Sequence, residues 1–402
     1  MKSTTSNREP IGKHTLPVES WSPDNLPEGE EVDYIDISSI DRERKTISRT
    51  TRITRESAPS RARQLVKRGD VLVSTVRPNL NAVAVIPENL DGAIASTGFC
   101  VLRCKDKAQD SRYLFHWLRT PHFITEMVRL ATGASYPAVT DRIIKESLLP
   151  LPEFSEQLRV ANILDRADAI RKKREDAIRT LDELKQSQFE AWFSSWFQPE
   201  AERDYVPVSH IVSRFEGGLN VATPKSPTPE TRHFILKVSA VTWGDYRPDE
   251  SKPLPPEFNP PKEHVVRKGD LLFSRANTTE LVGATVFVFD TPPNRVLPDK
   301  LWRFVWKNPS EVEPLFVWAL FNHPKIRYEI GRRATGTSGS MKNISMEKVM
   351  SIRVPWPDIE TQRRFARFTT EERKLRNRMS SSKEDAGSLF NSLIQRAFRG
   401  EL

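Results

Sequence analysis

The sequence predicts an α+β protein with two β-rich domains in tandem, each followed by a long helix. Three observations support this. A turn with the sequence Gly-Asp-Val-Leu-Val-Ser at residues 69–74 returns as Gly-Asp-Leu-Leu-Phe-Ser at residues 269–274, 200 residues later. A Pro-x-Pro segment that leads to a glutamine, residues 150–157, returns at residues 355–362. A charged stretch with apolar residues in heptad spacing follows each copy of that segment.

Each half also shows the same order of predicted elements. Alternating apolar and polar residues predict a first strand, and short apolar runs after the Gly-Asp turn predict three more. A short helix and a Gly/Ser-containing loop follow, before the Pro-x-Pro segment closes the half. The predicted strands cover residues 32–37, 71–73, 82–86 and 99–102, then 233–238, 271–273, 284–289 and 301–306; the helices cover 113–118 and 315–320, and the loops 132–136 and 335–340.

The two heptad stretches predict helices that pack along a seam. An apolar period of 3.5 residues over several heptads is typical of coiled coils. Polar residues interrupt both seams, which favours two helices that select each other in one register. An amphipathic helix on a globular core is the alternative. The predicted seam consists of Ile163, Ala167, Ile170, Ala177, Leu181 and Leu184 in the first stretch and Phe365, Phe368, Leu375, Met379, Leu389 and Leu393 in the second.

Charge favours a polyanionic partner. The chain has a net charge of +9, and its first half is polarised. The segment 19–41 has eight acidic residues and no Lys or Arg, whereas 42–68 has ten basic residues and two acidic ones. Such a run, rich in Ser and Thr, suits phosphate contacts, although a solvated basic loop would look the same. The DNA-binding candidates in this run are Arg42, Arg44, Lys45, Arg49, Arg52 and Arg55.

These motifs resemble those of specificity subunits of Type I restriction-modification systems, and the resemblance covers nearly the whole chain. It implies two target-recognition domains, each reading half of a bipartite asymmetric DNA site, and two spacer helices paired as an antiparallel coiled coil. The implied divisions are a disordered N-terminus at 1–13, recognition domains at 14–154 and 203–359, and spacer helices at 155–197 and 360–402.

The resemblance also implies partners. Methyltransferase subunits would dock on the helices, and motor-nuclease subunits would complete a restriction enzyme in the cytoplasm. We expect S-adenosylmethionine, ATP and Mg to bind those subunits and no cofactor to bind this chain. A sequence without a run of about 18 apolar residues predicts no membrane span. A scaffold that binds proteins and oligomerises through its helices is the alternative function.

Base-reading candidates lie in the polar loops after the Gly-Asp strands, and residues of the Gly/Ser loops could approach the backbone closely. For any single one of these residues, an ordinary surface-loop position is the alternative. Arginine can pair with guanine and asparagine with adenine, and glycine permits a close approach to the backbone. The candidates are Thr75, Arg77, Asn79, Ser135 and Tyr136 in the first half and Arg275, Asn277, Thr278, Thr279, Thr337, Ser338 and Lys342 in the second.

Sequence motifs of enzymes are missing or incomplete. There is no Gly-x-x-x-x-Gly-Lys-[Ser/Thr] phosphate-binding loop. Asn259-Pro260-Pro261 approaches an adenine methyltransferase motif, but Lys262 stands where an aromatic ring would stack on the flipped base. Neither the seven histidines nor the two cysteines have metal-ligand spacing. The sequence therefore predicts a subunit that is not catalytic by itself and binds no metal.

Overall fold

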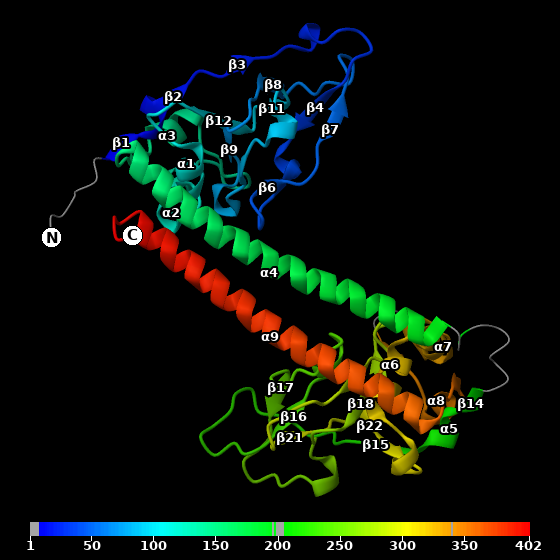
Figure 1. The fold of residues 1–402 in the computed structure, drawn as a ribbon. Coiled ribbons are helices and arrows are strands. Elements are labelled where there is room, and N and C mark those ends of the chain that lie inside the picture. Colours follow the sequence, from blue (N-terminus) through cyan, green and yellow to red (C-terminus); the bar gives the residue numbers. More distant parts are fainter. Residues whose placement is uncertain (1–7, 195–196, 198–204, 339–340) are drawn as a thin grey trace. The chain divides into compact units, whose positions relative to one another are not determined.

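The computed structural model describes residues 8–194, 197, 205–338 and 341–402 (Figure 1). The chain divides into two compact units, Met1–Thr180 with Arg378–Leu402, and Leu181–Asn377. We call them the first and second units. The division falls inside both long helices, so each unit contains part of each helix. The mixed helix-and-strand class predicted from the sequence is confirmed.

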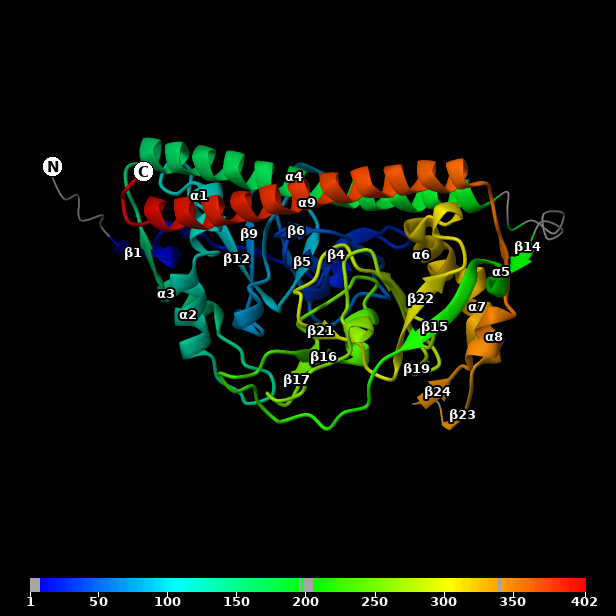
Figure 2. The same cartoon turned by 90° about the horizontal axis from the view of Figure 1, so that it is seen from below.

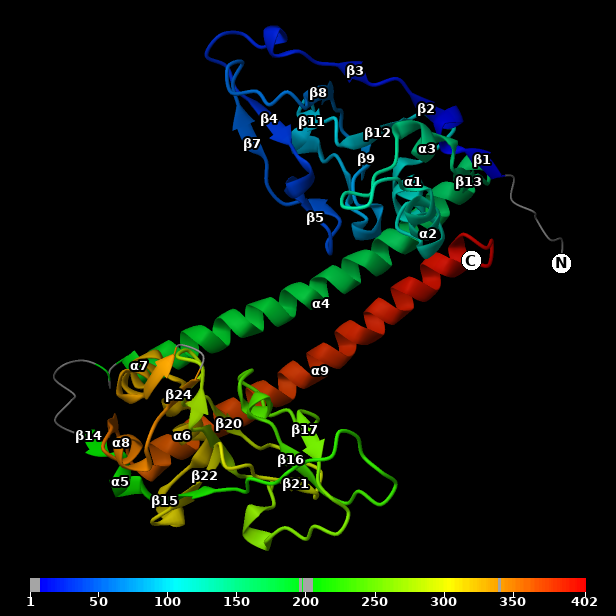
Figure 3. The same ribbon diagram turned by 180° about the vertical axis from the view of Figure 1, so that it is seen from behind.

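The first unit is built on two sheets. The Gly-Asp turn leads into β9 (Val71–Ser74), which is wholly buried. It pairs antiparallel with β10 (Val83–Val85) and β12 (Phe99–Cys104), and β2 (Thr15–Leu16) completes this sheet. The second sheet has the order β3-β8-β11-β4-β7, formed by Glu19–Ser20, Ala62–Leu65, Ile94–Ser96, Val32–Ile35 and Thr51–Ile53 (Figure 3).

Smaller elements complete the first unit. β1 (Arg8–Pro10) pairs antiparallel with β13 (Leu148–Pro150), and the next residue, Ile11, is fully buried. The expectation of disorder at 1–13 is therefore wrong for residues 8–13, because this segment closes the fold; residues 1–7 lie outside the described part. The other elements are β5 (Ile40–Asp41), β6 (Thr46–Ile47), α1 (Ser111–Trp117), α2 (Pro121–Leu130) and α3 (Asp141–Glu146).

The second unit repeats this frame (Figure 2). Its central strand β18 (Leu271–Ser274) is again wholly buried and pairs antiparallel with β20 (Thr285–Phe287) and β22 (Leu301–Trp306), with β15 (Val212–Gly217) at the edge. The parallel pair β16–β21 (Phe234–Leu236 and Arg295–Val296) matches the parallel pair β4–β11 of the first unit. Further strands are β17 (Ser251–Pro253), β19 (Ala276–Asn277), β23 (Thr335–Ser338) and β24 (Met341–Asn343), and β14 (Tyr205–Pro207) pairs with β25 (Arg353–Pro355).

Short helices of the second unit are α5 (Val208–Ile211), α6 (Pro314–Asn322), α7 (Pro324–Arg333) and α8 (Met346–Met350). The long helices are α4 (Phe154–Ser194) and α9 (Ile359–Ala397), of 41 and 39 residues. Both begin beside the repeated Pro-x-Pro segment, as expected. None of the described helices is long and apolar enough to cross a membrane.

The two long helices contact each other within each unit. In the first unit, Arg159 donates to the carbonyl of Leu402 at 2.7 Å, and the Arg171 guanidinium lies 5.9 Å from the Phe390 ring centroid. In the second unit, Asp182 pairs with Arg376 at 2.9 Å. Farther along α4, Lys185 pairs with Glu372 at 3.4 Å. In both units, residues farther along α4 contact residues that come earlier in α9, so the two helix segments within a unit run in opposite directions.

The packed face of α4 lies one residue later than the seam predicted from the heptads. Leu164 and Asp168 are buried, whereas the predicted seam residues Ile170 and Leu184 are 51% and 50% exposed. On α9, Phe365 is buried as expected, but Leu375 and Leu389 are 47% and 58% exposed. Placing these four residues in the seam was wrong. Charged residues take packed positions because they are ion-paired: Arg119, Arg171 and Lys172 all contact Asp168.

The remaining predicted seam residues are unequally buried. Ala177 is exposed, so its assignment to the seam was also wrong. The others are at least partly buried: Ile163, Ala167, Leu181, Phe368, Met379 and Leu393.

Candidate nucleic-acid interface

A largely buried ion pair fixes the Gly-Asp turn in each unit. Asp70 is 2% exposed and accepts two hydrogen bonds from Arg103, at 3.0 and 2.8 Å, and one from the Lys67 backbone N–H at 2.8 Å. In the second unit, Asp270 accepts from Arg303 at 2.7 Å and from the Arg267 backbone N–H at 2.7 Å. The aspartate thus closes the turn and ties it to the neighbouring strand. The repeated sequence motif includes the aspartate but not its arginine partner, which lies on β12 in the first unit and on β22 in the second.

The repeated glutamine makes the same hydrogen bonds in both units. Gln157 Oε1 accepts from the backbone N–H of Asp110, and Gln362 Oε1 accepts from that of Glu313, both at 3.0 Å. Each glutamine also donates to the carbonyl of the second proline of its Pro-x-Pro segment, Pro152 or Pro357. Both glutamines are buried. Each therefore joins the start of a long helix to the start of a short helix in the β-rich domain.

The loop after β9 presents a strained arginine. Arg77 and Asn81 have φ values of 50° and 45°, a left-handed conformation that is uncommon for residues other than glycine. They flank the short turn Pro78–Leu80. Arg77 is exposed, and its guanidinium lies 4.6 Å from the ring centroid of Tyr136, which is 68% exposed. Strained residues at a surface loop often mark functional sites.

The Gly/Ser loop supplies the other half of this pair. Gly133 has a φ of 100°, and a Cβ there would lie 2.8 Å from the carbonyl oxygen of Tyr136. Glycine is therefore required for the turn that presents Tyr136. Ser135 and Asn79 are also exposed. Thr75, by contrast, is buried and its hydroxyl donates to the Gly98 carbonyl at 3.0 Å, so its assignment as a base reader was wrong.

The corresponding loop of the second unit is more tightly held. Arg275 donates to the Asp299 carbonyl at 2.8 Å, and Asn277 Oδ1 accepts from the Thr278 backbone N–H at 2.9 Å. The Asn277 side-chain amide nitrogen is buried without a hydrogen-bond partner among the described residues. Lys342 donates to the Gly336 carbonyl at 2.9 Å, and Thr279 is exposed. The side chains of Thr337 and Ser338 lie outside the described part of the structure.

Only some of the basic side chains in the run of the first unit are available to bind a ligand, because others are already paired within the protein. Arg52 pairs with Glu31 and Asp33, and Arg55 pairs with Asp24 at 2.7 Å. Arg44 pairs with Asp176 on α4, and Lys45 donates to the Asn81 carbonyl. Arg42 and Arg49 are exposed, and no carboxylate of the described residues lies within ion-pair distance of either. Among the six candidates of the run, Arg42 and Arg49 are therefore the most available phosphate ligands.

The repeated frame therefore carries polar loops that are bonded differently in the two units. Within the described residues, no group of three or more His, Cys, Asp or Glu side chains is placed to hold a metal. Residues 19–180 match the model of the Type I restriction modification DNA specificity domain. This match confirms, over residues 19–180, the resemblance inferred from the sequence motifs.

The chain is also similar to subunits of Type I systems. The specificity subunit of the Type I restriction enzyme EcoKI from Escherichia coli is 25% identical over 324 residues, which is 76% of this chain and 68% of that subunit. A solved structure described as concerning complex assembly and conformational transition of the type I R-M system matches over the full length of both chains, with 23% identity and a TM-score of 0.62. The Type-I restriction-modification S subunit from M. genitalium matches with 13% identity and a TM-score of 0.59, covering 99% of this chain and 98% of that one. These structures share the fold.

Proposed function

We propose that this chain is the DNA-binding specificity subunit of a Type I restriction-modification complex and directs that complex to a bipartite asymmetric site. The observation that carries the proposal is the repeated frame with different surface loops. One frame, used twice, holds Arg77 and Tyr136 in the first unit and the differently bonded Arg275 and Asn277 in the second. Each unit would read its own half-site in the major groove, where base pairs present distinct donor and acceptor patterns.

The long helices suit the role of a spacer between half-sites. A straight helix of about 40 residues spans about 60 Å. DNA repeats its groove geometry every 10–10.5 base pairs, or roughly 35 Å, so a rigid helical pair can hold two readers on one side of a duplex. Ion pairs along the helix contacts, such as Asp182–Arg376, favour one register.

Catalysis would belong to partner subunits, which would bind S-adenosylmethionine, ATP and Mg. The exposed apolar residues of the long helices support a docking role. Ile170 and Leu375 are 205 residues apart, as are Leu184 and Leu389, the same offset that separates Gln157 from Gln362. The repeat therefore places an equivalent apolar pair on each helix. Ile170 and Leu389 lie in the first unit, and Leu184 and Leu375 in the second.

We expect the double substitution Ile170→Glu with Leu389→Glu to weaken binding of a methyltransferase subunit at least about tenfold, since a charge at the centre of an interface is desolvated without a partner. Stability of the free chain should change little, because both side chains are more than half exposed. Co-purification with the methyltransferase subunit measures the effect. Val128→Glu, at a 46% exposed position on α2, is the matched control. Unimpaired co-purification of the double variant would exclude this docking surface.

Binding to duplex DNA tests the DNA-binding role itself. Neutralisation of six phosphates gives a slope of about −5 in a plot of log affinity against log salt concentration. We expect a slope at least this steep for the assembled complex, and a slope shallower by about 2 when Arg42 and Arg49 are both replaced by Gln, because two phosphate contacts are removed. Fluorescence anisotropy with a labelled duplex gives both slopes. A wild-type affinity that does not respond to salt would favour the protein-scaffold alternative.

A further inference from the structure

The turn between β5 and β6 has a shape set by its own first residue. Asp41 Oδ1 accepts hydrogen bonds from the backbone N–H groups of Glu43 and Arg44, both at 2.9 Å. Lys45 then takes a left-handed conformation, with a φ of 55°, and its N–H donates to the Asp41 carbonyl. An aspartate that bonds to backbone groups two and three residues later is a common turn-former. The turn therefore holds Arg44 and Lys45 in defined positions at its tip.

Arg44 connects this turn to α4. Its Nη1 and Nη2 donate to the two carboxylate oxygens of Asp176, at 2.7 and 3.0 Å. The side chains of Arg44 and Asp176 are 28% and 38% exposed, so the pair is partly shielded from water. The hydrogen bonds to Asp176 raise the pKa of Arg44. A bidentate contact of this kind fixes the orientation of the two side chains as well as the distance between them.

Lys45 connects the same turn to the loop that carries Arg77. Its Nζ donates to the carbonyl of Asn81, the residue that ends the turn Pro78–Leu80, and Asn81 Nδ2 donates to the Leu118 carbonyl at 2.9 Å. Burial, together with Arg119 and Arg171, lowers the pKa of Lys45 to about 8. Arg77 and Asn81, both in the left-handed conformation, thus flank the turn Pro78–Leu80. Lys45 holds the end of this turn at Asn81.

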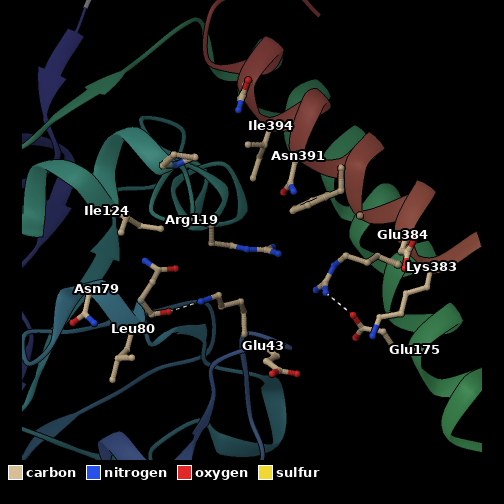
Figure 4. Close-up of a pocket in the computed structure, with 17 residues that line it drawn as sticks. Glu43, Asn79, Leu80, Arg119, Ile124, Glu175, Lys383, Glu384, Asn391 and Ile394 are labelled. Carbon is tan, nitrogen blue, oxygen red and sulfur yellow. Dashed lines mark hydrogen bonds and ion pairs between the residues drawn. The ribbon is translucent and has the colours of Figure 1, made fainter. Parts of the chain in front are cut away.

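Away from the β5–β6 turn, a cavity lies between the loop that carries Arg77 and the long helices. This cavity, of about 670 Å³, lies within the first unit, and Figure 4 shows Asn79 and Leu80 on one side of it and Glu175 and Lys383 on the other. The β5–β6 turn lines the cavity through Glu43 and Lys45. The turn therefore bridges a gap that close packing does not fill.

The second unit has a contact of the same kind, built from different residues. Asp245 lies 25 residues before Asp270, and Arg44 lies 26 residues before Asp70. Asp245 pairs with Arg373 on α9 at 3.0 Å, and the Arg373 guanidinium lies 3.8 Å from the Phe289 ring centroid. The positions of the positive and negative charges are exchanged between the two units. Each unit therefore has an ion pair between its domain and a long helix, at similar places in the domain but at different positions along the helix.

We propose that Arg44 and Lys45 are positioning residues that fix the Arg77 loop relative to α4, and so determine which gap between half-sites the protein accepts. This inference rests on the proposed function. Neither residue needs to touch DNA. Arg44 holds the turn against the helix, Lys45 holds the turn against the loop, and the angle of the reading loop follows from both. Loss of the helix contact should widen the range of accepted gaps and leave the half-site sequences unchanged.

The test compares DNA substrates with the native gap and with a gap one base pair longer or shorter. The assembled complex methylates each substrate, and the ratio of initial rates measures gap preference. We expect Arg44→Asp to lower that ratio about fivefold, the effect of losing a partly exposed ion pair. The charge-exchanged double variant Arg44→Asp with Asp176→Arg should restore most of the ratio. Arg68→Asp is the matched control, because Arg68 is an exposed arginine of the same unit that pairs with Glu88 and with neither long helix.

Three outcomes separate the possibilities. A lowered ratio that the charge exchange restores supports the proposal, since a general loss of stability would not be rescued in this way. A ratio for Arg44→Asp equal to that of wild type and Arg68→Asp overturns the positioning role but leaves the proposed function standing. A wild-type complex that shows no preference for any gap overturns the proposed function, and the positioning role with it.

Discussion

Replacement of Asp70 by alanine is expected to lower the opening free energy of the first unit's four-stranded sheet by about 3 to 5 kcal/mol. The substitution removes the buried carboxylate partner of Arg103, whose side chain is 13% exposed, and leaves this arginine only the longer carboxylate contact, 3.7 Å, to the exposed Glu19. It also removes the acceptor of the Lys67 backbone N–H that closes the turn. Hydrogen exchange of the amides in β9, β10 and β12, followed by mass spectrometry, measures the opening free energy locally.

The control for this substitution is Asp24→Ala. Asp24 also pairs with an arginine, Arg55, but its side chain is 76% exposed, so exchange in the same strands should not change. The equivalent substitution Asp270→Ala should accelerate exchange in β18, β20 and β22 of the second unit. If Asp70→Ala costs less than about 1 kcal/mol, the buried pair does not hold the sheet together.

Arg77→Ala is expected to reduce the affinity of the complex for its specific DNA site by about 10- to 100-fold, which corresponds to the loss of one good arginine–base contact. Affinity for unrelated duplex DNA should fall much less, because base contacts specify while phosphate contacts position. Competition binding with specific and unrelated duplexes at a fixed salt concentration gives both affinities. Tyr136→Ala should produce a smaller loss of the same kind, since the ring only supports the guanidinium.

Arg68→Ala is the matched control for Arg77→Ala. Arg68 precedes β9 and Arg77 follows it, so the two arginines lie at opposite ends of one short strand. The control removes the same charge from the same unit. Equal losses for specific and unrelated DNA in the Arg77 variant would show a phosphate contact in place of a base contact.

The repeated motifs were the most predictive part of the sequence because they encode buried interactions. Asp70 is buried and Asp270 is partly buried, each paired with an arginine, and Gln157 and Gln362 have several hydrogen-bond partners each. Such residues cannot vary without leaving a buried polar group unsatisfied. Their spacing therefore revealed the repeated order of elements along the chain and the start of both long helices.

Hydrophobic periodicity gave the wrong face of α4 for a physical reason. It selects apolar residues, but part of the packed face is charged: Asp168 is buried among three cations and Glu372 is buried against Lys185. Burial alone would raise the pKa of Asp168, yet Arg119 and Lys172 hold it below its ordinary value. Of the six apolar residues that the heptads identified on α4, three are exposed instead: Ile170, Ala177 and Leu184.

Single candidate residues were harder to predict than motifs. The basic run indicated phosphate contacts, but Arg44, Arg52 and Arg55 are engaged by carboxylates that are distant in the sequence. Charge density does not reveal such pairing before the fold is known. Thr75 was misassigned because a threonine directly after a strand is equally suited to a surface loop and to a buried hydrogen bond.

The most direct test of the central claim is a comparison of N6-methyladenine across the host genome with and without this gene, by single-molecule DNA sequencing. The strain should express the gene together with its chromosomal neighbours. The proposed function predicts a methylated bipartite motif with two different half-sites and a fixed gap, and the loss of that motif when this gene alone is deleted. A methylome that is unchanged by the deletion, in a strain where the complex is expressed, would contradict the claim.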